Sequence, residues 1–195
     1  MNHKFLTDVD EGLSSNPKFL SSRYFYDKIG DQLFIQIMKM PEYYLTNAEY
    51  EIFRLQSEQI IEALELKKDT YFELIELGPG DGLKTKELLK LLSKQNYKFD
   101  YLPIDISHNS LEALETSLNK EIPNISVKTK QGDYFGVLES LKQSNHPKIV
   151  LFLGSNIGNL NDSEAYDFVT RLDENLNTGD KFFLGVDLIK PYNIV

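Results

Sequence analysis

The chain predicts an α/β fold in which a mainly parallel sheet carries helices on both faces and is preceded by an N-terminal helical segment. Two patterns in its 195 residues indicate this fold. Up to about residue 70, apolar residues recur at helical spacing, whereas from residue 71 short apolar runs alternate with helical patterns. The sequence therefore predicts two regions, a helical segment at 1–70 and an α/β core at 71–195.

Two amphipathic helices are predicted in the N-terminal region, with an aromatic segment between them. Residues 30–40 have apolar side chains at helical spacing, and Pro41 ends this helix because proline cannot continue it. The second helix is expected to begin at Thr46, since Thr46 and Glu49 have the spacing of a capping box, and to continue to about residue 64. The segment between these helices, 41–45, contains two adjacent tyrosines.

The core region is predicted to consist of alternating strands and helices. The expected strands are 72–77, 99–104, 125–129, 149–153 and 181–186. The expected helices are 85–92, a helix with Ser107 as its N-cap, and 162–176. Because parallel strands end at one edge of a sheet, the residues that follow these strands are the candidates for binding a ligand.

Composition excludes several kinds of chemistry. The chain has no cysteine, which rules out thiol nucleophiles, disulfides, CxxC zinc sites and iron–sulfur clusters. Its three histidines, at positions 3, 108 and 146, are far apart in the sequence and form no metal-binding pattern. No metal site is therefore expected.

Charge and hydropathy limit the expected partners and location. The net charge is −9 and no basic block occurs, so neither nucleic acid nor an anionic membrane is an expected partner. The longest strongly apolar run, Ile149 to Leu153, is far below the roughly 20 residues of a membrane-spanning helix. The N-terminus lacks the apolar stretch of a secretory signal, and the chain is therefore expected to be soluble and cytoplasmic.

A glycine-rich loop follows the first predicted strand. After Glu76 come Gly78, Gly80 and Gly82, whose alternation lets the backbone turn tightly and approach a ligand at the start of a helix. The same pattern also suits a plain turn. The second strand leads into Asp105, whose carboxylate can accept both hydroxyl protons of a ribose, or can instead interact with the N-terminus of the next helix.

The third predicted strand is followed by Gly132, Asp133 and Tyr134. Asp133 can accept a hydrogen bond from an adenine amino group while aromatic and apolar side chains cover the ring, although Gly–Asp turns are common. The order of these three loops resembles the class I methyltransferases, whose Rossmann-like fold binds S-adenosylmethionine. Dinucleotide oxidoreductases share this layout, but their usual G-x-G-x-x-G spacing is absent because Leu83 stands at its last position.

Three longer strings carry a more specific resemblance. They are YFYDKIGDQLF at 24–34, MPEYYLTNAE at 40–49 and FLGSNIGNL at 152–160. Together they are similar to the histidine-specific methyltransferases, and the resemblance extends from about Leu20 onward. It implies that S-adenosylmethionine is the cofactor and that the α-amino group of an amino acid, L-histidine, is methylated, as in ergothioneine biosynthesis.

The resemblance also implies roles for individual residues. Those implied to hold the methyl donor are Glu76, Gly78, Gly80, Gly82, Asp105, Asp133 and Tyr134. Those implied to bind or position the amino acid are Tyr43, Tyr44, Gly154, Asn159 and Tyr26, and no residue is expected to act as a nucleophile. Without the resemblance, the tyrosines would be interpreted as packing between helices and Asn159 as a turn residue near a helix start.

The chain departs from the family pattern in two ways. Asn156 stands where the family usually has threonine or another small hydroxyl residue. Family members are also substantially longer, so the C-terminal strands and the substrate domain are expected to be absent. Two alternatives to histidine methylation stay open: a donor-binding fragment without turnover, and a family member that methylates another amino acid or an amine such as a tryptophan derivative. An uncovered edge at the fifth strand further predicts self-association.

Overall fold

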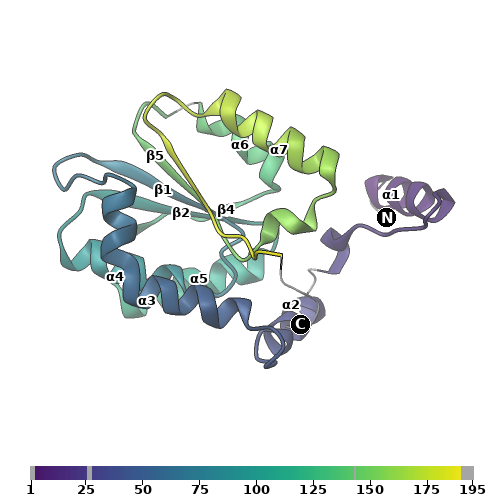
Figure 1. Ribbon diagram of the computed structural model, residues 1–195, viewed down its shortest axis with the longest axis horizontal. Helices are drawn as coiled ribbons and strands as arrows, with labels where there is room; N and C mark the ends of the chain where they lie inside the picture. The colour runs from purple at the N-terminus through teal and green to yellow at the C-terminus, as the bar shows by residue number, and fades with distance from the viewer. Residues whose placement is uncertain (1–2, 26–27, 143, 190–195) are drawn as a thin grey trace.

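The computed structural model describes residues 3–25, 28–142 and 144–189, and its centre is a parallel sheet with helices on both faces (Figure 1). The strands are β1 (Phe72–Leu77), β2 (Phe99–Asp105), β3 (Ser126–Val127), β4 (Lys130–Gln131), β5 (Lys148–Phe152) and β6 (Lys181–Leu184). Their order is β3-β2-β1-β5-β6, with β4 also paired to β2, and every strand pairing among the described residues is parallel. The predicted α/β fold is confirmed.

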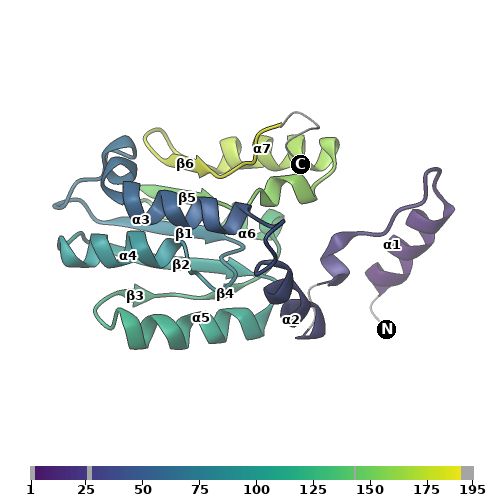
Figure 2. The same cartoon turned by 60° about the horizontal axis from the view of Figure 1, so that its bottom comes forward.

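Helices cover both faces of this sheet (Figure 2). On one face lie α3 (Leu45–Ala63), α4 (Thr85–Lys94) and α5 (His108–Glu121), and on the other lie α6 (Tyr134–Leu141) and α7 (Asp162–Asn175). Leu74 of β1 packs with the first group and its neighbour Ile75 with the second, because successive side chains of a strand point to opposite faces. The central strands are therefore buried on both sides, which explains their continuous apolar sequences.

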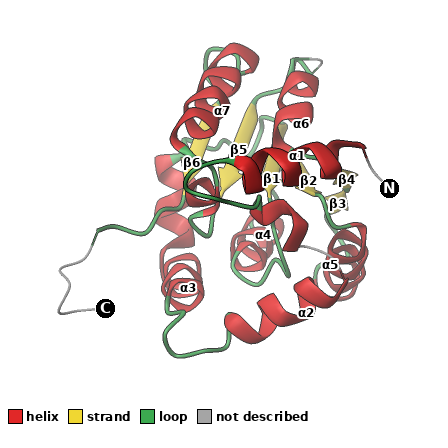
Figure 3. Cartoon of the chain, turned by 90° about the vertical axis from the view of Figure 1, so that its right-hand side faces the viewer, coloured by secondary structure: helices red, strands yellow, loops and turns green. Residues whose placement is uncertain are grey.

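The N-terminal elements lie beyond the carboxyl ends of the strands (Figure 3). They are α1 (His3–Ser14), the 3₁₀ helix η1 (Ser22–Phe25) and α2 (Lys28–Ile37). Tyr24 holds α1 against η1, since its ring packs edge-on against Phe5 at 4.9 Å and its hydroxyl donates to the Asp8 carboxylate at 2.6 Å. None of the described helices is both long enough and apolar enough to cross a membrane.

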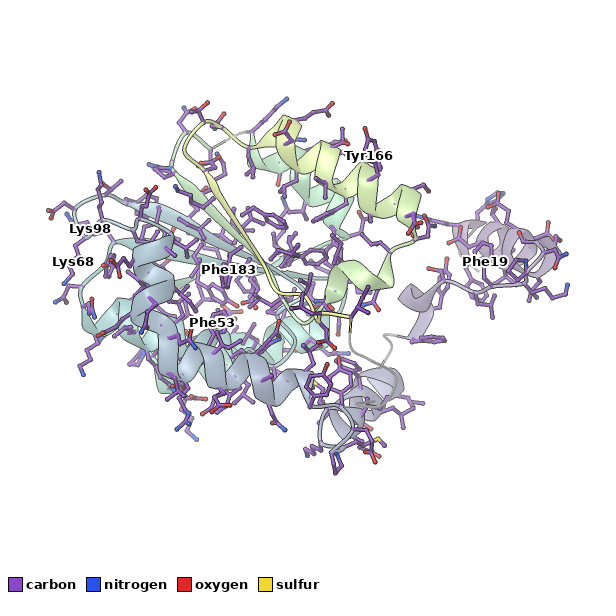
Figure 4. The ribbon with its side chains drawn as sticks, in the orientation of Figure 1. Phe19, Phe53, Lys68, Lys98, Tyr166 and Phe183 are labelled. Atoms are coloured by element: carbon purple, nitrogen blue, oxygen red, sulfur yellow. The ribbon has the colours of Figure 1, made fainter. Side chains whose placement is uncertain are left out.

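Helix α3 differs from the other N-terminal elements because it packs against the sheet. Its Phe53 is buried and meets Phe183 of β6 edge-on, with ring centroids 6.1 Å apart (Figure 4). Ile60 and Ile61 join the same apolar cluster. Helix α3 thus belongs to the predicted helical segment 1–70 in the sequence, but its side chains pack in the core of the sheet region.

Most predicted elements are present with small shifts at their ends. Ser107 caps α5 as expected, by accepting a hydrogen bond from the amide of Ser110 at 3.2 Å. Helix α2 begins at Lys28 and ends at Ile37 rather than running from 30 to 40. Helix α6 was not predicted, and it begins directly after the turn at Asp133.

Two local predictions are wrong. Of the strand expected at 125–129, only Ser126–Val127 (β3) is a strand, and a second short strand, β4, follows at Lys130–Gln131. The two pair with β2 on either side of Pro103, which has no amide proton to continue the ladder. The capping box at Thr46 is also absent, because α3 begins at Leu45 without a side-chain cap. Glu49 is buried instead, and its carboxylate accepts a hydrogen bond from the distant amide of Gly154.

Candidate functional site

A cavity of about 930 Å³ lies at the carboxyl ends of the strands. Its floor comes from the loops after β1, β2, β4 and β5, and its opposite wall comes from η1 and α2. Of the residues predicted from the sequence, those that line it are Gly78, Gly80, Asp105, Asp133, Tyr134 and Asn159. The structure therefore brings residues implied for the donor and for the acceptor into one cavity.

The glycine loop turns sharply between β1 and α4. Gly78 has a φ of +68°, and its amide donates to the carbonyl oxygen of Ile104 at 2.8 Å, which ties the loop to β2. A Cβ at Gly78 would lie 2.6 Å from the Tyr134 hydroxyl oxygen and would need a left-handed backbone, so a larger residue there would strain the loop or displace Tyr134. A Cβ at Gly80 would meet nothing within 4 Å, so the backbone at Gly80 faces open space in the cavity.

Two residues implied for donor binding lie beneath the cavity rather than in it. Glu76 is 1% exposed, and its carboxylate accepts hydrogen bonds from the hydroxyls of Thr85 at 2.8 Å and Tyr101 at 2.5 Å. Burial raises the pKa of the Glu76 carboxyl above its ordinary value. Glu76 therefore ties the end of β1 to α4 and β2, while Gly82 allows close packing against Leu114 of α5.

Asp105 lies at the end of β2, on the cavity side. Its carboxylate accepts a hydrogen bond from the amide of Ser107 at 2.9 Å, and its carbonyl oxygen accepts one from Gly132 at 3.0 Å. The interaction with the start of the next helix, one of the two sequence interpretations, is thus present. The same hydrogen bond holds the Asp105 carboxylate beside the cavity. Interaction with the next helix and binding of a ribose are therefore compatible roles for Asp105.

Asp133 and Tyr134 begin α6. Asp133 is the N-cap of this helix and accepts a hydrogen bond from the amide of Gly136 at 2.9 Å. The Tyr134 ring packs edge-on against Phe152 of β5, with centroids 5.1 Å apart. Both residues line the cavity beside the glycine loop.

The loop after β5 carries the predicted asparagine. Gly154 and Ser155 have left-handed backbones, with φ of +73° and +54°, and they lead into the 3₁₀ helix η2 (Asn156–Asn159). Asn156 reaches the glycine loop, where its amide nitrogen donates to the carbonyl oxygen of Gly78 at 3.4 Å. Asn159 lines the cavity, whereas Gly154 does not.

The tyrosines of the 41–45 segment do not line the cavity. Tyr43 packs edge-on against Phe34 of α2 at 6.0 Å, and burial together with the negative charge of Glu49 raises its pKa. The Tyr44 hydroxyl donates to the carboxylate of Asp187, whose amide donates to the Ser155 hydroxyl at 2.6 Å. Their roles in substrate binding stay predictions.

Other candidates lie elsewhere in the N-terminal segment. Tyr26 falls outside the described residues. Tyr24, from the same sequence string, lines the cavity beside the apolar side chains of Phe34, Ile35 and Met38. Tyr24 was not among the residues predicted from the sequence. It could have been, because it belongs to the string at 24–34 that resembles the family.

The charge of the lining is one-sided. Its ionisable carboxylates are those of Asp81, Asp105, Asp133 and Glu164, and no lysine or arginine is among the described lining residues. These carboxylates would repel the phosphates of a dinucleotide, whereas they would attract a cationic ligand. The cavity thus favours a positively charged nucleoside over a dinucleotide.

The sequence did not predict a partly buried ion pair next to the cavity. The Lys84 ammonium lies 2.5 Å from Glu49 Oε2, with the two side chains 16% and 9% exposed. The two residues come from the glycine loop and from α3, which are far apart in the sequence. No local sequence pattern predicts an ion pair between them. The capping-box spacing instead predicted that Glu49 interacts with the start of its own helix at Thr46.

Comparison with known proteins agrees with this geometry. The family model described as histidine-specific methyltransferase, SAM-dependent, matches residues 5–195. Histidine N-alpha-methyltransferase of Mycobacterium tuberculosis is 36% identical over 183 residues, which are 94% of this chain and 55% of that protein. Ergothioneine biosynthesis protein 1 of Neurospora crassa is 31% identical over 173 residues, 88% of this chain and 19% of that protein.

This chain therefore spans about half the length of the mycobacterial relative. Among solved structures, an S-adenosylmethionine-dependent methyltransferase from Clostridium acetobutylicum has a TM-score of 0.54 at 13% identity, over 78% of this chain and 56% of that one. At this identity the similarity concerns the fold alone. Because the family match covers nearly the whole described chain, this chain belongs to the histidine-specific, S-adenosylmethionine-dependent methyltransferase family.

Proposed function

We propose that this chain binds S-adenosylmethionine and takes part in methylating the α-amino nitrogen of an amino acid, L-histidine. The observation that carries the proposal is the single cavity shared by Gly78, Asp105 and Asn159, with acidic and no basic lining residues in the described chain. The names of the relatives support histidine as the acceptor. Amino-acid recognition also agrees with the small-molecule size of the cavity.

The residues present fit this cofactor. The open space at Gly80 lets a ligand approach the backbone, and the carboxylate of Asp105 suits the two hydroxyls of a ribose. Asp133 and Tyr134 are placed to contact the adenine, while Glu76 and Gly82 act indirectly by shaping the glycine loop. The acidic lining complements the positive charge of the sulfonium centre.

The bound cofactor supplies a methyl group attached to positively charged sulfur, which is electrophilic. The residues of this chain have to present an uncharged amine to that group, because the protonated amine has no lone pair. The apolar side chains of Phe34, Ile35 and Met38 limit access by water on one side of the cavity. We assign to Asn159 the orientation of the amino acid, because its amide can both donate and accept hydrogen bonds.

Calorimetric titration tests the proposal. The full natural polypeptide is titrated first with S-adenosylhomocysteine and then with L-histidine. We expect binding of both ligands, with Asp105→Ala weakening the first by about ten- to a hundredfold, the size of one or two charge-assisted hydrogen bonds. Asp100→Ala is the matched control, since Asp100 is in the same strand but pairs with Lys128 at the sheet edge.

The outcomes separate the alternatives. Binding of S-adenosylhomocysteine without any amino acid would identify a donor-binding unit without turnover. Binding of a tryptophan derivative in preference to histidine would reassign the acceptor. Absence of S-adenosylhomocysteine binding would refute the proposal.

A further inference from the structure

We propose that Glu49 is a positioning residue for the acceptor amino acid, because it fixes the loop that carries Asn159. This inference rests on the proposed function and adds a residue that holds the acceptor side of the site. Glu49 itself does not line the cavity. Glu49 acts through the backbone of Gly154, the second residue of the loop after β5.

The contacts of Glu49 converge on one amide. The Gly154 nitrogen lies 2.9 Å from Oε1 and 3.0 Å from Oε2 of Glu49, so its N–H donates to both carboxylate oxygens. Glu49 is 7% exposed, and its carboxylate also pairs with the ammonium of Lys84. One buried carboxylate therefore joins α3, the glycine loop after β1 and the loop after β5.

The residues after β6 leave space for the Glu49 carboxylate beside Gly154. A Cβ at Gly185 would lie 2.3 Å from Glu49 Oε1, so the absence of a side chain there makes room for the carboxylate. The carbonyl oxygen of Gly185 in turn accepts a hydrogen bond from Ser155 at 3.0 Å. The loop is thus held at Gly154 by Glu49 and at Ser155 by the end of β6.

The position of Gly154 determines the direction of the residues that follow. Gly154 and Ser155 both have positive φ, and the amide of Gly158 then donates to the Ser155 carbonyl oxygen at 2.8 Å. A left-handed serine is unfavourable by itself and persists where surrounding contacts determine it. Releasing the Gly154 amide would remove one of these contacts and let Asn159 move relative to the cavity.

A purely stabilising role explains this arrangement less well. Replacing a buried ion pair with apolar residues is often neutral or stabilising, so such a pair is weak support for a stability function. In contrast, a charge-assisted hydrogen bond from one particular amide, shared between the two oxygens of one carboxylate, fixes the position of that amide. Burial, and then the negative charge of Glu49, raises the pKa of Tyr43, the other residue predicted to position the acceptor.

The test compares Glu49→Ala with Glu49→Gln. The glutamine amide oxygen can still accept the Gly154 hydrogen bond but carries no charge, whereas alanine removes the acceptor. The measurements are the Kd of S-adenosylhomocysteine, the Kd of L-histidine in its presence, and hydrogen exchange at the Gly154 amide. Glu65→Ala is the matched control, because Glu65 follows the same helix and pairs with Lys181 at the surface.

We expect Glu49→Ala to raise the Kd of histidine at least tenfold and to speed exchange at Gly154 at least tenfold, with less than threefold change in the Kd of S-adenosylhomocysteine. Glu49→Gln and Glu65→Ala should stay within threefold of the parent protein on all three measurements. An unchanged histidine Kd in Glu49→Ala would overturn the inference, as would an equal loss in Glu49→Gln or an equal loss of both ligands. Failure of the proposed function is distinguishable, since the parent protein would then bind no S-adenosylhomocysteine or no histidine, and the inference would be rejected with it.

Discussion

The hydroxyl of Tyr134 occupies the space that a side chain on Gly78 would need. An alanine methyl group at Gly78 would lie 2.6 Å from this oxygen and 2.9 Å from the amide nitrogen of Asn156. Three segments far apart in the sequence, the loop after β1, the start of α6 and the loop after β5, therefore meet at one backbone atom. This contact sets the shape of the cavity floor.

Gly78→Ala should accordingly weaken both folding and donor binding. The left-handed backbone alone costs about 1–3 kcal/mol for a residue other than glycine, and the collision pushes Tyr134 into the cavity. We expect the affinity for S-adenosylhomocysteine to fall at least tenfold in calorimetry. Gly179→Ala is the control: Gly179 has a φ of +97° but lies in open space, so stability should fall while binding is kept. Unchanged donor binding in Gly78→Ala would contradict this account of the loop.

Asn159→Ala should damage acceptor binding and leave the donor nearly unaffected. Asn159 lies in the cavity at the end of η2, and its loss removes about 0.5–1.5 kcal/mol per hydrogen bond to the amino acid. Titration with L-histidine in the presence of S-adenosylhomocysteine measures the effect. The exposed Asn119 at the far end of α5 provides an asparagine-to-alanine control. Equal weakening of both ligands by Asn159→Ala would remove its assignment to the acceptor.

Glu76→Gln should change how stability depends on pH. Burial raises the pKa of Glu76 in the folded protein, so the unfolded chain loses this proton at lower pH than the folded chain. The contribution of Glu76 to stability is thus fully present below the ordinary pKa of about 4.5 and is lost as the pH rises toward the folded pKa. Glutamine cannot ionise, so the variant should gain stability relative to the parent protein over this window.

Urea unfolding at a series of pH values measures this difference. Each unit of pKa shift corresponds to about 1.4 kcal/mol. Glu87→Gln is a suitable control, since Glu87 lies in α4 nearby but its ion pair with Lys90 is at the surface. A stability difference between Glu76→Gln and the parent protein that does not vary with pH would contradict the raised pKa.

Strand β6 lies at the edge of the sheet that the described residues form, and we predict that this edge promotes self-association of the 195-residue chain. Among the described residues β6 pairs only with β5, and Leu184 is 38% exposed at its end. A charged residue on an edge strand discourages pairing with another chain, so Leu184→Lys should lower the sedimentation coefficient seen at high protein concentration. Tyr166→Lys, on the exposed surface of α7 (Figure 4), should not. A parent protein that sediments as a monomer at every concentration would disprove this prediction.

Local sequence was informative wherever a residue and its structural partner are close along the chain. The apolar runs predicted β1 and β5 to within one residue. Strands that are buried on both faces need apolar side chains at nearly every position, so they appear in the sequence as continuous apolar runs. Ser107 was assigned as a cap because its partner, the amide of Ser110, is three positions away. The capping-box spacing at Glu49 failed because a buried partner from the loop after β5 competed for the same carboxylate.

The sequence by itself determined the alternation of strands and helices, which follows from periodicity, and the turn at Gly78, which follows from the backbone freedom of glycine. It also put Asp105 at the end of a strand, because the residue directly follows an apolar run. Only the tertiary structure decided which of the implied residues share a cavity. It placed Glu76 beneath the site and Asn159 in it, and it joined Glu49 to Gly154 across 105 positions of sequence. The physical reason is that burial and hydrogen-bond partners depend on how the chain packs in three dimensions, which no local pattern encodes.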